Sequence, residues 1–456
     1  MTKTIKLIKS NLLLILVCSL FLITRIYKIS EIPASVYWDE ASIGYNAYSV
    51  LTTGKDEWGE TLPLHFRAFG EFKLPVYIYF VVVSQFVFGM NTFALRLPAV
   101  LFGLLSIVGL YLLVLKLTKQ KTIALFSSFL FSITPWFFIF SRTGYEAVAG
   151  LALFIWAIYF LLLSFEKKWY LLLSTILFVG SFYSYNSFRI LSPLILGFVF
   201  VFNTYKKQFA VAIVAAIILL TSMVPLYKLY KQDSGLSRLQ AVGSSAVVSN
   251  YFKNFSLSYL FISGDTNPRS QFPNQSQLYL IDAVFLVLGL IYIVRSKNPK
   301  LYLILGLLLL APIPAAITKE NPHALRSILM SPLLSIISAI GISVIARNFA
   351  TKQSGSIVIV LYLVFFGRYY YNFLANYNDQ ASAAWQYEYK EIFENQKEGC
   401  VSDQYAQPYI FALYYNKVDP NYFISTRTLN PVNDWGFSTV AGFGNYTFPK
   451  ICGETN

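Results

Sequence analysis

Charged residues are scarce in this chain. Only 13% of its 456 residues are Asp, Glu, Lys or Arg, whereas a soluble domain carries about 25%. Hydrophobic residues make up 56%, and apolar runs of about 20 residues, long enough to cross a bilayer core, recur along the whole length. A β-barrel would instead show alternating segments of about ten residues. The sequence therefore predicts an all-α polytopic membrane protein.

The sequence is also poor in the motifs of several common chemistries. Its only histidines are His65 and His323, which excludes an all-histidine metal site. It has no Gly-rich phosphate loop, CxxC pair or HExxH helix, so neither an ATP-driven transporter nor a nucleotide-sugar enzyme with a cytosolic catalytic domain is expected. The net charge of +14 comes from small clusters between apolar runs, as the positive-inside rule produces, and does not indicate a nucleic-acid partner.

These cationic clusters predict how the chain crosses the membrane. Lysines near the start place the N-terminus in the cytoplasm, and the first apolar run lacks a small-x-small cleavage site, so we expect an uncleaved span. Farther along the chain, every second gap between apolar runs is rich in Lys and Arg. This predicts cytoplasmic loops at 116–121, 166–168, 206–208, 295–300 and 347–353. The spans, about eleven in number, are predicted at 11–26, 97–115, 123–140, 147–165, 169–186, 190–204, 209–227, 279–294, 301–317, 326–346 and 355–367.

One apolar run does not fit this alternation. Counting residues 74–90 as a span would move every later basic cluster outside, so we expect this run to lie in the outer interface or to re-enter from it. Residues 28–96 then form a first outer loop, and residues 228–278 form a second. The predicted division is a transmembrane catalytic domain over 1–367 and a small extracytoplasmic domain over 368–456.

The three cysteines divide between these regions. Cys18 lies in the first span, where we expect it to pack. Cys400 and Cys452 both lie in the predicted outer domain, where an oxidising compartment would permit a disulfide. We expect that bond, and the alternative is two unpaired buried thiols.

Ionisable residues at the membrane edge are costly and indicate function. The first outer loop opens with Tyr37-Trp38-Asp39-Glu40. Adjacent carboxylates beside a tryptophan make a candidate general base, because partial burial raises a carboxylate pKa. The alternative is a solvated acid pair, or a helix cap supplied by Asp39.

Two further sites on the same predicted face carry cations. Glu71 and Lys73 precede the interfacial run, where a lysine at a helix start either holds a phosphate or snorkels to the surface. Arg142 is the only cation in a very short outer turn, and arginine is the usual clamp for a phosphate.

The outer turn over residues 318–326 brings more ionisable side chains to the membrane surface: Lys319, His323 and Arg326. His323 could ligate a metal or donate to a phosphate. A lone histidine in a turn is more often structural, so both interpretations of it stay open.

Taken in order, several of these pieces resemble a known family. The series resembles the GT-C glycosyltransferases of the protein O-mannosyltransferase and lipid A aminoarabinose transferase type (family 39-like), best between Tyr37 and about Glu146. That family also has interfacial helices in its first outer loop. Its Lys-Pro-Pro step is Lys-Leu-Pro here, with Leu74 as the departure. The pieces are Asp39-Glu40, Lys73-Leu74-Pro75, Arg96-Leu97-Pro98-Ala99-Val100-Leu101-Phe102-Gly103-Leu104, Pro135-Trp136 and Ser141-Arg142.

The resemblance implies roles for individual residues. Asp39 matches the essential acid of the family and Glu40 matches its neighbour. Lys73 and Arg142 match basic positions that face the donor phosphate. Further candidates are His323 and Arg326 for the donor phosphate, and Tyr37, Trp38, Glu71, Tyr145, Glu146, Asp265 and Arg269 for the substrate pocket.

The implied function is transfer of a sugar from a polyprenyl-phosphate donor to a glycan, lipid or protein acceptor on the outer face of the cell membrane, with inversion. We expect no obligatory cofactor, although a divalent metal is possible through Asp39, Glu71 or His323.

Three rival functions are a transporter or flippase, a ligase for lipid-linked glycans, and a non-catalytic scaffold. A transporter predicts charged or broken spans, whereas these spans hold almost no charge. A ligase would not call for the Tyr37–Glu40 loop, and mutation of Asp39 would separate a scaffold from an enzyme.

Overall fold

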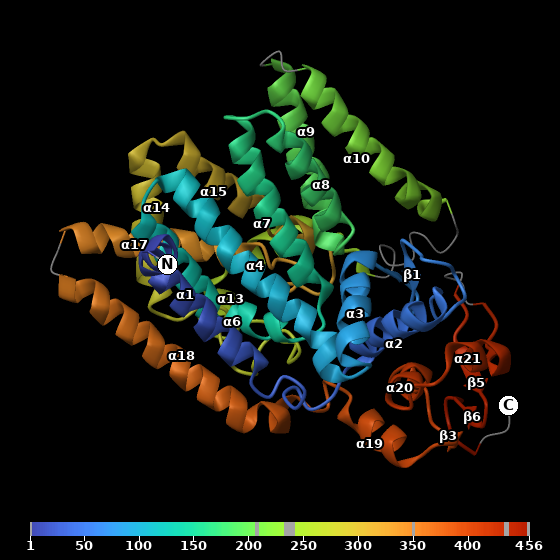
Figure 1. The fold of residues 1–456 in the computed structure, drawn as a ribbon. Coiled ribbons are helices and arrows are strands. Elements are labelled where there is room, and N and C mark those ends of the chain that lie inside the picture. The colour runs from blue at the N-terminus through green and yellow to red at the C-terminus, as the bar shows by residue number, and fades with distance from the viewer. Residues whose placement is uncertain (1, 206–208, 232–241, 349–351, 433–436, 454–456) are drawn as a thin grey trace.

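The structure, a computed structural model, describes residues 2–205, 209–231, 242–348, 352–432 and 437–453. It is built mainly of helices (Figure 1). Each predicted span overlaps at least one helix, and the predicted loop 206–208 and part of 347–353 lie outside the described residues. These helices are α1 (Thr2–Ile26), α4 (Thr92–Thr118), α5 (Lys121–Ile133), α7 (Glu146–Ser164), α8 (Tyr170–Phe182), α9 (Asn186–Tyr205), α10 (Phe209–Tyr230), α14 (Asp282–Ser296), α15 (Pro299–Leu310), α17 (Met330–Asn348) and α18 (Lys352–Ala381).

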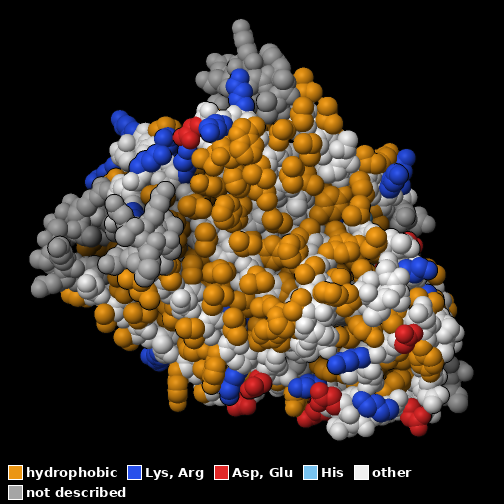
Figure 2. Space-filling model, in the orientation of Figure 1, with side chains coloured by type: hydrophobic (Ala, Val, Ile, Leu, Met, Phe, Trp, Pro, Cys, Tyr) orange, Lys and Arg blue, Asp and Glu red, His pale blue; other side chains and the backbone are white. Residues whose placement is uncertain are grey.

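A hydrophobic belt crosses the middle of the molecule, with charged side chains at its upper and lower edges (Figure 2). The chain is therefore a multi-pass membrane protein, while the count of eleven spans and their orientation stay predictions. Within the described ranges, five helices are long and apolar enough to cross a membrane: Thr92–Thr118, Glu146–Ser164, Ile213–Tyr230, Pro299–Ala316 and Ser356–Ala381.

The predicted span 123–140 is broken. Helix α5 ends before Pro135, which has no N–H to continue the ladder, and Thr134 is extended, with ψ of 135°. The chain resumes as α6 (Pro135–Phe138) and the 3-10 turn η1 (Phe140–Arg142), bent by 65° from α5. This bend delivers the turn before α7 to the site described below.

The first predicted outer loop folds into α2 (Trp38–Thr53), the strand pair β1 (Phe66–Arg67) and β2 (Phe72–Lys73), and α3 (Pro75–Phe88). Helix α3 has 14 residues and is about 21 Å long, shorter than a bilayer core of about 30 Å. It packs on α2 and α4, and the expectation that this run does not cross stays a prediction.

The second predicted outer loop and the C-terminal region contain short elements. Cys400 and Cys452 are bonded, which confirms the predicted disulfide. Helix α18 runs past residue 367 to Ala381, and the proposed domain division stays a prediction. The elements are α12 (Val247–Lys253), α13 (Leu257–Phe261), α16 (Ile313–Ala316), α19 (Tyr387–Asn395), α20 (Pro408–Tyr415), α21 (Pro420–Thr426), and a sheet ordered β3 (Gly399–Cys400), β6 (Tyr446–Thr447), β5 (Val440–Phe443), β4 (Thr428–Leu429).

The C-terminal helices lie directly against the first loop, with α20 and α21 packed on α2 (Figure 1). The approach is close at Gly44, where a Cβ atom would lie 2.5 Å from Tyr414 Cε2. Gly44 O also accepts a hydrogen bond of 2.9 Å from Gln85 Nε2 on α3. Helix α2 is therefore held from two sides, and its first turn has a fixed position.

Candidate functional site

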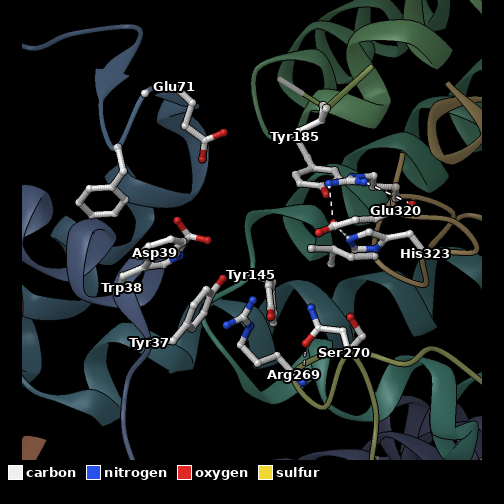
Figure 3. A pocket seen from close by; sticks show the side chains of 16 residues that line it. Tyr37, Trp38, Asp39, Glu71, Tyr145, Tyr185, Arg269, Ser270, Glu320 and His323 are labelled. Carbon is white, nitrogen blue, oxygen red and sulfur yellow. Dashed lines mark hydrogen bonds and ion pairs between the residues drawn. The ribbon is translucent and has the colours of Figure 1, made fainter. Parts of the chain in front are cut away.

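A cavity of about 310 Å³ opens where the first loop, the turn before α7 and the two later loops meet (Figure 3). Asp39 and Glu71 face it from one wall, and Glu320 and His323 face it from the opposite wall. Its lining includes eight of the residues predicted from sequence: Tyr37, Trp38, Asp39, Glu71, Tyr145, Arg269, His323 and Arg326. Lys73 lines a smaller neighbouring cavity of about 60 Å³.

An ion-pair cluster forms the first wall. Lys73 Nζ lies 2.5 Å from Asp39 Oδ1 and 3.3 Å from Glu71 Oε1. The Lys73 side chain is only 4% exposed, whereas that of Asp39 is 27% exposed. Burial by itself lowers the pKa of the Lys73 ammonium, but the carboxylates of Asp39 and Glu146 more than offset this, and its pKa lies above the usual value. Lys73 is therefore a charged ammonium inside the site.

The start of α2 is fixed by the segment that follows α18. Trp38 N donates to Gln386 Oε1 at 2.9 Å, which satisfies one of the backbone donors that a helix start leaves open. The Tyr37 ring lies edge-on to Trp385, with centroids 5.2 Å apart. The sequence interpretation missed both partners, because neither residue belongs to a motif and each lies about 350 positions away along the chain.

Glu40 is not among the residues that line the cavity, and its catalytic role stays a prediction. Its side chain is fully buried and accepts hydrogen bonds from Arg96 Nε at 3.0 Å and Nη2 at 2.9 Å. It also accepts from Gly144 N at 2.6 Å, and a Cβ on Gly144 would lie 3.0 Å from Glu40 Cγ. Glu40 therefore ties α2 to α4 and to the turn before α7, and so positions Asp39 and Tyr145.

Arg142 is also absent from the lining of the cavity, and its contact with the donor phosphate stays a prediction. Its guanidinium is buried and donates to the carbonyls of Thr24, Tyr27, Lys28 and Ile32 at 2.9 to 3.2 Å. These carbonyls belong to the end of α1 and the segment after it, where Lys28 O also accepts from Glu31 N and Ile32 N. Arg142 thus fixes how the first loop leaves the membrane helices.

The opposite wall carries two arginines and a histidine. Arg269 Nη1 donates to Ala384 O at 3.0 Å, and its guanidinium lies over the Tyr37 ring at 5.1 Å. Burial by itself lowers the pKa of Arg269, but the phenols of Tyr145 and Tyr37 and the Asp39 carboxylate raise it above its usual value. The sequence interpretation placed Arg269 only among pocket residues, and the structure points it towards Asp39 and Tyr37 (Figure 3).

Arg326 and His323 meet at Glu320. Arg326 Nη2 lies 3.3 Å and His323 Nε2 lies 3.7 Å from Glu320 Oε2. The sequence interpretation missed Glu320, although its place three residues before His323 was a usable signal.

The last two predicted pocket residues lie beside the main cavity. Glu146 lines the smaller cavity next to Lys73, and Asp265 lines a neighbouring cavity described below. Among the residues that the structure describes, no three His, Cys, Asp or Glu side chains are grouped so that they could hold a metal ion. Asp39, one of the residues considered as a metal ligand, contacts Lys73. Whether the reaction depends on a metal stays a prediction.

Comparison with known proteins gives the class of this fold. The chain is similar to apo ArnT from Cupriavidus metallidurans (TM-score 0.53, 13% identity, covering 74% of this chain and 60% of that one). ArnT bound to undecaprenyl phosphate gives a TM-score of 0.53 at 12% identity, with 77% and 64% covered. AglB from Archaeoglobus fulgidus, in complex with an inhibitory peptide and a dolichol-phosphate, gives 0.54 at 15%, with 81% and 56% covered. This chain spans less than two thirds of each.

The fold is therefore that of the GT-C membrane glycosyltransferases. Within that class, residues 73–227 match the sequence model of the family of dolichyl-phosphate-mannose-protein mannosyltransferases, and this confirms the resemblance inferred from the sequence. No curated protein matches the chain in sequence.

Proposed function

We propose that this chain transfers a single sugar from a polyprenyl-phosphate-linked donor to an acceptor hydroxyl, with inversion. The observation that carries the proposal is the Asp39–Lys73 pair, 2.5 Å apart, with Asp39 lining a cavity that also presents Arg269 and Arg326. A carboxylate for the acceptor proton and cations for the departing phosphate are the groups that this displacement needs. The family match over residues 73–227 and the ArnT complex with undecaprenyl phosphate support a lipid-phosphate donor.

In the proposed step, Asp39 takes the proton of the acceptor hydroxyl while the hydroxyl oxygen bonds to the anomeric carbon. The bond from that carbon to the phosphate oxygen breaks, and its electron pair leaves with the lipid phosphate. Lys73 and Arg269 stabilise the charge that grows on the phosphate. Attack opposite to the leaving group inverts the anomeric centre, and no nucleotide takes part.

The size and lining of the cavity support transfer of one sugar. Tyr37, Trp38, Tyr145 and Tyr185 contribute aromatic rings, whose faces pack against the C–H faces of sugars. A volume of about 310 Å³ is near the lower end for small-molecule pockets. It suits a single sugar residue better than the whole glycan that a ligase transfers.

We also propose that the cavity faces the outside of the cell membrane, with the N-terminus in the cytoplasm and the C-terminal region outside. The support is the positive-inside rule applied to loops such as 116–121 and 166–168. A lipid-phosphate donor would then enter from the outer leaflet, together with a glycan, lipid or protein acceptor.

The direct test is incubation of the purified protein in lipid nanodiscs with a panel of undecaprenyl- and dolichyl-phosphate hexoses and pentoses. Release of lipid phosphate is measured, and the anomeric configuration of the product is read by NMR. Asp379→Asn, an exposed carboxylate on α18, is the matched control for Asp39→Asn. The proposal fails if no donor releases lipid phosphate above the level seen with Asp39→Asn.

A further inference from the structure

A second and larger cavity, of about 490 Å³, lies beside the first. It is formed by the segments 256–267 and 319–323 of the two later loops. Asn267, Glu320 and His323 line both cavities, so these side chains form a shared partition. A molecule seated in the second cavity therefore lies next to the proposed site of sugar transfer.

The partition is held in place by Asp265. Its Oδ1 accepts from Asn267 N at 2.9 Å, and its Oδ2 accepts from Ala324 N at 2.7 Å. Burial raises the pKa of this carboxyl group, and the backbone donors oppose that shift. Because its Oδ2 accepts from Ala324 N of the other loop, Asp265 joins the two loops.

The remaining lining is dominated by neutral polar groups. Ser258 and Ser263 hydroxyls lie 2.9 Å apart at the surface, and Thr266 adds a third exposed hydroxyl. Asn321 Nδ2 is buried without a hydrogen-bond partner in the described part of the chain. A buried donor that makes no hydrogen bond costs about 1–3 kcal/mol. Hydroxyls and amides of this kind bind ligands that are themselves rich in hydroxyls.

The charges around the second cavity oppose an anionic occupant. Asp265, Glu320 and Lys319 all line it, so two carboxylates accompany one ammonium group. A phosphate there would meet the exposed carboxylate of Glu320 with Lys319 beside it, whereas the first cavity presents Arg269 and Arg326. An uncharged molecule with many hydroxyl groups meets no such repulsion.

Resting on the function proposed above, we infer that the second cavity binds the acceptor, and that the acceptor is a neutral carbohydrate. One of its hydroxyls would reach past Asn267 and His323 to Asp39. Leu257 and Ile262, the sequence neighbours of the lining residues Ser258 and Ser263, are 72% and 69% exposed. The carbohydrate can therefore come from a glycolipid or from a soluble glycan.

The test measures binding, so it does not depend on turnover. Asp39→Asn protein in nanodiscs is titrated with methyl and octyl glycosides of glucose, mannose and galactose, and bound ligand is followed by saturation-transfer NMR. Thr266→Trp and Ser258→Trp, two exposed positions that line the second cavity, narrow it by independent routes. Ser425→Trp, an exposed position on α21, is the matched control.

We expect at least one glycoside to bind, and we expect both cavity variants to weaken it about tenfold or more while Ser425→Trp does not. Tighter binding of the octyl form assigns a glycolipid, and equal binding of the two forms assigns a soluble glycan. Absence of glycoside binding, or equal binding by all variants, overturns the inference. So does binding of a Ser/Thr peptide in place of the glycosides. Release of lipid phosphate by the wild-type chain tests the proposed function separately.

Discussion

The two facing walls of the first cavity are held in different ways. On the first-loop wall, Asp39 is followed by Glu40, whose carboxylate is fully buried against Arg96. On the other wall, the side chain of Glu320 is 75% exposed where it meets Arg326, whose side chain is 12% exposed. A buried ion pair resists rearrangement because separating it leaves uncompensated charge, whereas an exposed pair exchanges easily with water. The difference indicates that the reacting groups are fixed on the first wall, while the second wall can adjust to a substrate.

The largest effect should come from Asp39→Asn on the first wall. The amide keeps the size of the side chain but cannot accept a proton, so transfer should fall by about 100-fold or more. Thermal stability should change little, because Asp39 is partly exposed and the neighbouring carboxylate of Glu71 still contacts Lys73. The measurement is the rate of lipid-phosphate release at saturating donor, with an unfolding curve recorded beside it.

Full activity of Asp39→Asn would remove this residue from the mechanism and make the first wall no more reactive than the second. Asp379→Asn should behave as wild type in both measurements.

Glu40→Gln should act on folding instead of chemistry. The neutral amide leaves Arg96 buried without its ion-pair partner, and a broken buried pair costs about 3–5 kcal/mol. We expect a large drop in unfolding temperature, and any protein that still folds should retain part of its transfer activity, because Glu40 positions Asp39 and Tyr145 without reacting itself. Glu60→Gln, at an exposed position of the same loop, is the control. A stable but inactive Glu40→Gln would support a catalytic role for Glu40.

Arg142→Lys tests whether Arg142 supports the fold from its buried position outside the cavity lining. Lysine keeps the charge but cannot reach four separate carbonyls, so the variant should lose about 1–3 kcal/mol of stability. The donor KM of the folded protein should stay unchanged, because Arg142 is absent from the lining of the cavity. A raised donor KM at unchanged stability would contradict this and support contact with the donor phosphate.

The sequence indicated the helices because hydrophobicity is a local property that sums over about 20 residues. It also indicated the Asp39–Lys73 neighbourhood and the Cys400–Cys452 bond. The break in the predicted span 123–140 was missed, although Pro135 was a usable signal, because the proline was treated as part of a family motif.

What the sequence could not show is how each buried charge uses its hydrogen bonds. Arg142 and Arg269 are alike as residue types, yet Arg142 is occupied by carbonyls about 110 positions away, and Arg269 faces the cavity. Gln386 supports the start of α2 from about 350 positions away. Such pairings depend on which segments pack together, and no local pattern encodes them.

Glu320→Gln should have the smallest effect and gives the sharpest contrast with Asp39→Asn. The substitution removes a carboxylate that lies 3.3 Å from Arg326 and 3.7 Å from His323. Exposed ion pairs contribute about 0–1 kcal/mol, so stability should be nearly unchanged. With its partner neutral, Arg326 is freer to meet an anionic donor, and the donor KM should fall by about twofold or less.

Because the pair is exposed, this change in KM should be visible at an ionic strength of about 0.01 M and nearly vanish at about 1 M, where charges are screened within a few ångströms. The measurement is donor KM at both salt concentrations for wild type and Glu320→Gln, with Asp379→Asn as the control for loss of an exposed carboxylate. If Glu320→Gln instead abolished transfer as Asp39→Asn does, Glu320 would be an acid or base in the reaction. The second wall would then carry chemistry of its own, and the contrast between a fixed reactive wall and an adjustable binding wall would be wrong.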